Sequence, residues 1–542
     1  MSRREALFTA ALVFAVALVV RAVGAAQIVF PKPEDTAYYV SVARNLVEGR
    51  GLVADALWSY QTPPLIFPRP AFEVWLPLPT FLAAIPMMLF GTTFGAAQVS
   101  SALVGAAVPV LAWRLAADVA IERGLPLGRA RTLAIGTGLT SAAYLPLVLH
   151  SALPDSTMPF AALALGACLL MSRIARDPRE LRLSDPRVIT LGVVIGMAAL
   201  TRNEAIWLGL VWAIVAWRIS GGVPLLLRAR AIGAAGLVSL AIFAPWMVRD
   251  WVVFGSPLPG QAAANAFSIT GFDIFAWNDP PTLSRYLAVG PARLLTMRVE
   301  GVSHNLFSVL LLPGVPLSVV GLIALPWQAR ILALRPVVLV GAVTFLVTSL
   351  AFPVATTWGT FLHAAGPVHV LLVICALLGL DAAIARIGVY RRWTRPVAWL
   401  GATLGIAGSL LFSAVFLPSF GAGSRATAEQ FAELGRRLAL IGESMGAGTG
   451  PVISNFPIWL AETQGVPGLA LPNEPPSDVL DLARTFDARL VVLAGAQHGQ
   501  WPAVLEGDAT DAECFRELDL GVGPAGVPDP LADVRVYEIV CP

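Results

Sequence analysis

Two acidic residues, Glu34 and Asp35, open a short polar segment that follows the first long apolar stretch of the chain. A third acid, Asp155, lies in another short polar segment, and Arg69 and Arg202 lie in further segments of this kind. A carboxylate can take a proton from an attacking hydroxyl group, and arginine can bind two phosphate oxygens at once. These residue types therefore suit proton abstraction beside a bound phosphate, provided that the fold brings them to one place.

The composition indicates what surrounds these segments. The 542-residue chain is 56% hydrophobic and only 13% charged, which is more apolar surface than a soluble domain can bury. Long apolar stretches with few charges predict a polytopic, mostly α-helical membrane protein. The formal net charge is only +2, and the positive charge is confined to loops, so no nucleic-acid partner is indicated.

A helix needs roughly 20 apolar residues to cross the hydrocarbon core of a bilayer. The segment 72–91 is apolar but contains Pro77, Pro79 and Pro86, so we expect a re-entrant or interfacial piece there. Irregular backbone at membrane depth is stable only against protein or a water-filled cavity, so this assignment implies a cavity beside the segment. About eleven crossings are predicted, near residues 6–29, 95–117, 132–151, 157–173, 188–201, 204–219, 231–251, 304–326, 336–353, 366–386 and 397–417.

Arginines cluster in every second loop, and cationic loops stay on the cytoplasmic side during insertion. This pattern predicts a cytoplasmic N-terminus and an extracytoplasmic C-terminus for an integral protein of the plasma (inner) membrane. The first apolar run is too long for a typical signal-peptide core, so we expect a retained helix. The clustered residues are Arg3, Arg4, Arg114, Arg123, Arg129, Arg131, Arg173, Arg176, Arg179, Arg182, Arg187, Arg218, Arg228, Arg230, Arg330, Arg335, Arg386, Arg391, Arg392 and Arg395.

Three regions are long enough to fold outside the membrane, at 30–94, 252–303 and 418–542. The first two are expected to be outer loops of a transmembrane catalytic domain that covers 1–417. In the third, predicted strands alternate with predicted helices, which favours a small, mostly parallel α/β domain outside the cytoplasm. Two of the four cysteines, at positions 514 and 541, lie in this domain, either as a disulfide or as two free thiols.

The first outer loop opens with a predicted amphipathic helix over residues 35–48, lying at the membrane surface. Asp35 would stand at the start of this helix. As an N-cap it would stabilise the helix by roughly 1 kcal/mol, and such a role is compatible with catalysis. The apolar residues that share one face of the helix are Val40, Ala43, Leu46 and Val47.

The stretch from Asp35 and Tyr38 to Gly51, directly after the first span, resembles the membrane glycosyltransferases of the GT-C superfamily. The resemblance is greatest to glycosyltransferase family 39, the branch of the protein O-mannosyltransferases and the lipid A aminoarabinose transferases. It rests on the order of the motifs and on their common predicted outward side. Four further segments resemble the family at matching places, namely 67–75, 153–160, 199–205 and 244–257.

This resemblance implies an enzyme that takes a sugar from a polyprenyl-phosphate carrier at the outer face of the membrane and transfers it to an acceptor. Asp35 would be the base, with inversion at the anomeric carbon, and Asp155 a second functional acid in the same cavity. Arg69 and Arg202 would hold the phosphate of the lipid. Further substrate contacts are expected from Glu34, Tyr38, Arg249 and His304.

Two positions depart from the pattern of the family. The family often has Asp-Glu where this chain has Glu34-Asp35, and Pro68 stands where related enzymes can carry a metal-binding acid. The second departure puts a divalent metal in doubt, so no residue is assigned to metal binding.

Several of these residues also have a purely structural interpretation. Asp155 could begin the next helix, and Arg202 could be an interfacial anchor whose side chain extends toward water. A hydrogen-bonded structural role is the other interpretation of His304, and it is the one given to His363 and His369. At the level of the whole protein, a transporter or flippase of a lipid-linked or anionic substrate could use the same arginines without chemistry. A scaffold whose tail binds a partner is the third possibility.

Overall fold

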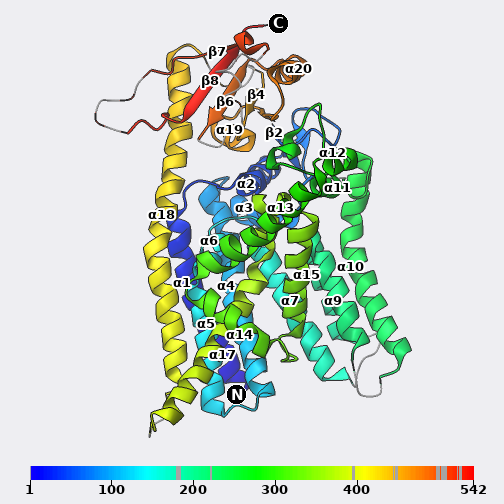
Figure 1. Cartoon of the computed structure of the whole chain (residues 1–542), viewed down its shortest axis with the longest axis vertical. Helices are drawn as coiled ribbons and strands as arrows, with labels where there is room; N and C mark the ends of the chain where they lie inside the picture. Colours follow the sequence, from blue (N-terminus) through cyan, green and yellow to red (C-terminus); the bar gives the residue numbers. More distant parts are fainter. Residues whose placement is uncertain are drawn as a thin grey trace.

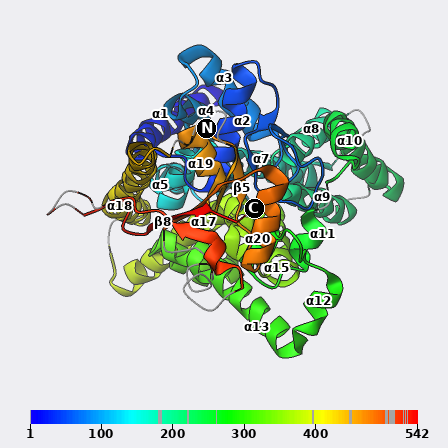
Figure 2. The same cartoon turned by 90° about the horizontal axis from the view of Figure 1, so that it is seen from above.

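A bundle of helices makes up most of the molecule, and a small sheet with its own helices lies at one end of the bundle (Figure 1). Seen from above, α19 (Pro457–Gln464) and α20 (Pro476–Phe486) lie over the bundle rather than beside it (Figure 2). The two chain termini lie toward opposite ends of the long axis. The computed structural model describes residues 2–178, 185–219, 223–259, 261–393, 397–443, 445, 450–495, 501, 510–521, 523, 526 and 528–541.

Six helices within these residues are long and apolar enough to cross a membrane, namely α1 (Arg3–Gln27), α4 (Phe94–Glu122), α7 (Thr157–Arg176), α10 (Leu225–Phe254), α17 (Gly366–Tyr390) and α18 (Trp399–Leu440). Two bent pairs bring the number to eight: α5 (Leu127–Ala143) with α6 (Leu145–Ser151), bent by 54°, and Gly290–Gly314 with α14 (Leu317–Gln328), bent by 117°.

Shorter apolar helices complete the bundle, namely α3 (Leu78–Phe90), α8 (Pro186–Ala199), α9 (Ile206–Trp217) and α15 (Arg335–Ala351). Each of the eleven predicted spans coincides with a long helix, a bent pair or a short apolar helix. Hydrophobic length therefore locates the helices, whereas the number that crosses the membrane stays a prediction.

The break between α5 and α6 is stabilised by side chains from two other helices. The last carbonyl groups of a helix have no partner within it. At the end of α5, the carbonyl oxygens of Ser141 and Ala142 accept hydrogen bonds from the fully buried Arg21, and Ser413 Oγ donates to the carbonyl oxygen of Ala143 at 2.6 Å. These bonds satisfy the exposed backbone where the chain changes direction.

Several of the arginines pair with acids near the end of the bundle that carries the N-terminus. Arg131 lies 2.9 Å from Glu5 in the first turn of α1, and Arg176 lies 2.7 Å from the buried Asp118 at the end of α4. These contacts place the start of α5 near the start of α1, and the end of α7 near the end of α4. Three of the clustered arginines, at positions 179, 182 and 395, lie outside the described residues.

Helix α3 has one face against the protein and one open face. Ala83, Ala84 and Met87 pack with Val40 of α2 (Glu34–Val47) and with Ala97 of α4. The residues of the open face are Phe81, Ile85, Met88, Leu89 and Phe90. The short, half-covered α3 thus connects the bundle to α2.

A six-stranded sheet has the order β2-β5-β4-β6-β8-β7. The first four strands, β2 (Ala56–Leu57), β5 (Gly468–Ala470), β4 (Val452–Ser454) and β6 (Leu490–Ala494), are parallel, and β8 (Val534–Ile539) and β7 (Phe515–Glu517) are antiparallel to their neighbours. In register, Leu57 lies opposite Leu469. Strand β2 comes from the first outer region, so two distant parts of the chain build one sheet. A second, two-stranded sheet pairs β1 (Val53–Ala54) with β3 (Arg69–Pro70).

The remaining elements lie in the outer regions and connections, namely η2 (Asn203–Ala205), α11 (Gln261–Ala266), η3 (Gly271–Phe275), α12 (Leu283–Ala288), α13 (Gly290–Ser303), η4 (His304–Leu311), η5 (Leu312–Gly314), η6 (Ala355–Trp358), α16 (Thr360–Ala364) and η7 (Ala512–Cys514). Helix α18 continues unbroken to Leu440, past the boundary predicted at 417, and β4 begins at Val452. Cys514 and Cys541 form a disulfide, which decides between the two interpretations of this pair.

Candidate functional site

Helix α2 holds Asp35 in its first turn, directly after the first long helix of the bundle. The N-cap position is occupied by Pro33 and not by Asp35, so the capping role expected for this carboxylate is wrong. Eight of the fourteen residues of α2 are buried, so the helix is not the surface-lying amphipathic helix that the apolar pattern predicts. Asp35 keeps 25% of its side chain exposed and can therefore meet a substrate.

The imidazole of His363 joins the two predicted functional carboxylates. His363 lies in α16, and its Nε2 is 3.2 Å from Asp35 Oδ2. Its Nδ1 is 2.7 Å from Thr157 Oγ1 and 3.7 Å from Asp155 Oδ2. With only 4% of its side chain exposed, His363 fixes the relative position of two segments that lie far apart in the sequence.

His363 is buried and hydrogen-bonded, as its structural interpretation expects, and one of its partners is the predicted base Asp35. The sequence contains one signal that could have singled it out. The short loop 354–365 is predicted to lie on the same side of the membrane as Asp35 and Asp155, and His363 is its one histidine.

Asp155 begins the next helix, as its structural interpretation expects, and it also faces His363. Its Oδ1 accepts a hydrogen bond from the backbone N–H of Thr157, the first residue of α7, at 2.7 Å. Its Oδ2 is buried, has no hydrogen-bond partner among the described residues and faces His363. The same carboxylate thus supports a helix start and directs one free oxygen into the site.

Burial and neighbouring charges set the protonation of Asp35, His363 and Asp155. Burial raises the pKa of Asp35, but the hydrogen bond and charge of His363 and the charge of Arg202 outweigh burial, and the pKa lies below its usual value. Burial would lower the pKa of His363, and the two carboxylates raise it above its usual value. For Asp155, burial dominates and raises the pKa. The arrangement favours an ionised Asp35 held by a protonated imidazole.

Arg202 lies beside this group and is held by several partners. Its guanidinium pairs with Glu204 at 2.8 Å, donates to Ser156 Oγ at 3.0 Å and to the carbonyl oxygen of Thr360 at 3.2 Å. These bonds join the loop before α7 to the start of α16. Arg202 is therefore not an interfacial anchor extending toward water, and its charge contributes to the low pKa of Asp35.

Arg69 lies in the interior of the first outer region. It is fully buried, donates to the carbonyl oxygens of Ser59 and Thr62 at 2.6 Å each, and lies 3.1 Å from Glu73. All of these partners belong to the segment 59–73. In this conformation Arg69 holds that segment together, and phosphate binding by Arg69 stays a prediction.

Arg249 is the more accessible of the predicted cations of this region. It lies near the end of α10, where its guanidinium is 4.8 Å from the ring centroid of Trp246 and 6.0 Å from that of Phe72. Among the described residues its ion pair is with Asp250, at 2.9 Å, and 21% of its side chain is exposed. Tyr38 lies on the other side of Phe72, whose backbone N–H donates to the Tyr38 hydroxyl at 2.6 Å.

Trp75 links the aromatic side chains around Arg249 to Asp35. Its ring centroid lies 4.1 Å from that of Tyr38, and its indole N–H also contributes to lowering the pKa of Asp35 by hydrogen bonding. Trp58 packs against Trp75 at 4.8 Å. Both tryptophans are buried, so they belong to the core beside the site and not to an interfacial belt of aromatic residues.

Two predicted substrate contacts lie elsewhere. Glu34 accepts hydrogen bonds from the backbone N–H of Ile458 at 3.0 Å and from Trp58 Nε1 at 3.2 Å, and burial raises its pKa to about 8. It therefore points toward α19. His304 begins the π-helical segment η4, and no hydrogen bond or ion pair among the described residues joins it to Asp35 or Arg202.

One set of side chains could hold a divalent ion. One ligand atom from each of His150, Asp155 and His363 lies within 4.8 Å of the others. His150 Nδ1 and Asp155 Oδ2 are buried without a hydrogen-bond partner among the described residues. His363 is bonded at both ring nitrogens, to Asp35 and to Thr157, and a protonated imidazole offers no lone pair to a metal. The set would bind an ion only after His363 lost a proton and released Thr157, so no metal is assigned to it.

A small cavity lies beside Asp155, between α3, α4 and α7. It has a volume of about 10 Å³ and is lined by Pro79, Leu82, Ser101, Val104, Pro154 and Asp155, among others. This is about the space that one water molecule needs. It lies where the prolines of 72–91 led us to expect a cavity, and it is too small for a sugar.

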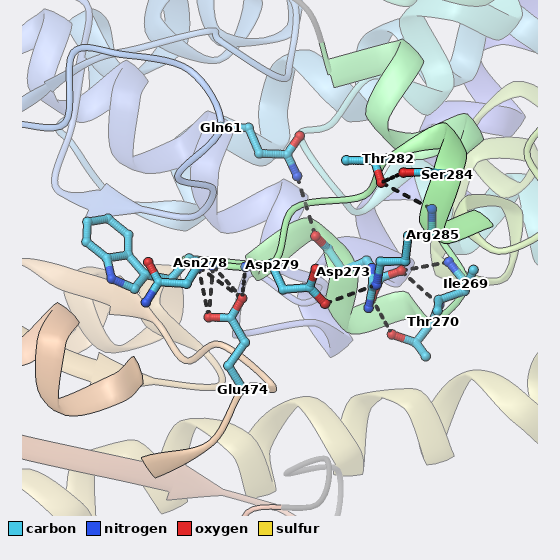
Figure 3. Close-up of polar contacts among 11 residues, drawn as sticks. Gln61, Ile269, Thr270, Asp273, Asn278, Asp279, Thr282, Ser284, Arg285 and Glu474 are labelled. Atoms are coloured by element: carbon cyan, nitrogen blue, oxygen red, sulfur yellow. Dashed lines mark hydrogen bonds and ion pairs between the residues drawn. The ribbon is translucent and has the colours of Figure 1, made fainter. Parts of the chain in front are cut away.

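The C-terminal unit, which comprises the elements from β4 to β8 that follow α18, also holds the second outer region (Figure 3). The Glu474 carboxylate accepts hydrogen bonds from three successive backbone N–H groups, those of Trp277, Asn278 and Asp279, at 2.7 to 3.1 Å. Arg285 pairs with Asp273 and Asp279 at 3.1 Å each, so the loop is braced from within as well. Beneath it, Phe275 packs on Trp58 at 5.1 Å, next to the aromatic side chains beside Asp35.

The chain is similar to known proteins in structure and not in sequence. No protein-family model matches the chain, and no curated protein matches it in sequence. Among solved structures, it is similar to ArnT from Cupriavidus metallidurans bound to undecaprenyl phosphate, with a TM-score of 0.58 and 12% identity over 97% of both chains. It is also similar to the oligosaccharyltransferase AglB from Archaeoglobus fulgidus in complex with an inhibitory peptide and a dolichol-phosphate. That TM-score is 0.57, with 13% identity over 97% of this chain and 75% of AglB.

At this level of identity the likeness is one of fold, and it extends over nearly the whole chain, beyond the region 1–260 in which the motifs lie. The chain therefore shares the fold of these two proteins over nearly its whole length.

Proposed function

We propose that this protein is a glycosyltransferase that moves a sugar from a polyprenyl-phosphate donor to an acceptor hydroxyl at the non-cytoplasmic face of the membrane. The single observation that carries the proposal is the junction of Asp35, His363 and Asp155, with Arg202 beside it. Support comes from the GT-C fold and from the lipid phosphates bound by the two similar proteins.

The chemistry requires a base on one side of the anomeric carbon and cations on the other. The acceptor oxygen forms a bond to the anomeric carbon and gives its proton to the Asp35 carboxylate. The bond between the anomeric carbon and the phosphate oxygen breaks, and the phosphate leaves with the electron pair. A single displacement of this kind inverts the configuration at the anomeric carbon.

Each protein group has one task in this scheme. Asp35 takes the proton, because it is ionised and has an exposed edge. His363 holds the carboxylate in place from its buried side, and Asp155 and Thr157 hold His363. Fixed cations stabilise the charge that develops on the leaving phosphate, which is most effective where water is excluded. Arg249 and Arg202 are assigned to this task.

The proposal is tested with purified protein and a donor that carries a labelled sugar. The expected result is release of polyprenyl phosphate together with label in the acceptor or in water. A transporter or flippase would move the lipid and leave the bond between sugar and phosphate intact. If the bond survives with every sugar and acceptor class tried (protein, lipid and glycan), the enzymatic proposal fails.

Arg249 is tested before Arg202 because more of its side chain is exposed, 21% against 13%, and the loss of either arginine leaves a buried carboxylate without its partner. Arg249→Gln should reduce kcat/KM for the donor about 10- to 100-fold, the effect of losing one charge-assisted contact to phosphate. The matched control is Arg293→Gln, which removes an exposed arginine paired with Glu300 in the same outer region. Equal donor kinetics for both variants would exclude Arg249 from the phosphate site.

A further inference from the structure

Helix α19 of the C-terminal unit lies against α2, the helix that carries Asp35. Trp459 of α19 donates from Nε1 to the carbonyl oxygen of Pro31 at 3.1 Å, just before α2 begins. Its ring also packs on Phe30, with centroids 5.6 Å apart. The entry of the chain into α2 is therefore fixed by the C-terminal unit.

Both ends of α2 are bonded to α19. At the first turn, Glu34, the neighbour of Asp35, accepts the backbone N–H of Ile458. In the last turn, Arg44 forms two hydrogen bonds with Glu462, at 2.7 and 2.5 Å. The two attachments are ten residues apart, which is roughly 15 Å along a helix. Attachment at two such points fixes both the rotation of α2 about its axis and its position along that axis.

The pair of Arg44 and Glu462 is well shielded from water. Glu462 keeps 7% of its side chain exposed and Arg44 keeps 26%. Arg44 also donates from Nε to the carbonyl oxygen of Thr92 at 3.2 Å, so it joins α19, α2 and the start of α4. A two-pronged contact between arginine and carboxylate is directional, and it resists rotation better than a single bond.

The partner of Asp35 is held by different elements. His363 lies in α16 and is bonded to Thr157 at the start of α7, in the bundle. The 3.2 Å contact between Asp35 and His363 therefore joins α2, which α19 holds at both ends and α3 packs against, to a helix that is held within the bundle alone.

We propose that the C-terminal unit positions the base of the reaction, with Glu462 and Arg44 as the positioning residues. This inference rests on the proposed glycosyl transfer. It gives the C-terminal unit a part in catalysis without contact to substrate. A displacement of about 1 Å at a reacting group can cost about a hundredfold in rate, so a small shift of α2 is sufficient.

The test compares Glu462→Gln with the wild type in polyprenyl-phosphate release. Glu462→Gln should lower kcat about 10- to 100-fold and leave the KM for the donor within about twofold, since the donor contacts are intact. The acidic limb of the pH–rate profile should move to higher pH, because Asp35 loses contact with His363. The exchanged pair Arg44→Glu with Glu462→Arg should recover part of the loss.

The control is Glu538→Gln, which removes an exposed pair with Arg516 in the same unit and should change neither kcat nor the pH profile. Hydrogen exchange of residues 34–47 gives a readout that does not depend on turnover, and Glu462→Gln should accelerate it. If the wild type turns over donor and Glu462→Gln keeps its kcat and its pH profile, the positioning role is refuted and the function stands. If the wild type turns over no donor, the function fails, and unchanged exchange in the variant would refute the attachment of α2 as well.

Discussion

Asp35→Asn is expected to lower kcat for release of polyprenyl phosphate by about 10²- to 10⁴-fold, the usual contribution of a general base. Asparagine has the shape of aspartate and can still accept a hydrogen bond from His363 Nε2, so α2 and α16 should keep their places. The lost function is then the ability to take a proton from the acceptor. Donor affinity, measured by binding of polyprenyl phosphate, should change by less than about twofold, because the variant removes no contact to phosphate.

The control for this variant lies on the same helix. Glu48 follows the last turn of α2, is exposed and accepts a hydrogen bond from Thr92. Glu48→Gln removes the same charge from the same helix and should leave kcat unchanged. Full turnover by Asp35→Asn would remove Asp35 from the role of base and leave Asp155 as the next carboxylate to test.

The helices of this fold could be predicted from the sequence because each predicted span carries a long apolar signal of its own. The order of strands and helices in the tail follows from local patterns as well. Strand β2 could not be predicted, because it is two residues long and becomes a strand only by pairing with β5. The end of α18 was missed for a similar reason, since the helix continues past Pro418 where the apolar stretch stops.

The site shows the same limit at the level of single residues. Consecutive positions in a helix are rotated by about 100°, so Glu34 and Asp35 cannot face one site, and the sequence does not say which of them does. In the fold, Asp35 faces His363 and Glu34 faces α19. Arg69 shows the same limit, because an arginine in a predicted outer loop gives no sign in the sequence of whether it meets substrate or its own loop. In this conformation it is fully buried and donates to carbonyl groups of its own loop.

Tertiary structure brings His363 to Asp35, and the role proposed for it gives the second large effect. His363→Gln should lower kcat about 10- to 100-fold, because the base loses the charge and the hydrogen bond that hold it. The cation of His363 keeps the pKa of Asp35 below its usual value, so its removal must raise that pKa. The acidic limb of kcat/KM should therefore move to higher pH in the variant.

The basic side of the profile follows from the raised pKa of His363. The stability that this histidine contributes is fully present below its unfolded pKa of about 6.5, and it is lost as the pH rises through the higher folded value. The contribution of Asp35 has the opposite sign, being present above an unfolded pKa of about 4 and lost as the pH falls through its lowered value. The ion pair is thus complete only between these limits.

The turnover and the thermal stability of the wild type should accordingly fall together as the pH rises through the folded pKa of His363. This fall is the basic limb of the pH profile, and it should be absent from the profile of His363→Gln. The measurement is kcat/KM and the melting temperature of both proteins over the same pH range. His369→Gln is the matched control, since it also replaces a buried histidine, in the first turn of α17, but has no ion pair with Asp35 or Asp155 among the described residues. An unchanged acidic limb in His363→Gln, with the fold intact, would show that the imidazole does not set the protonation of Asp35.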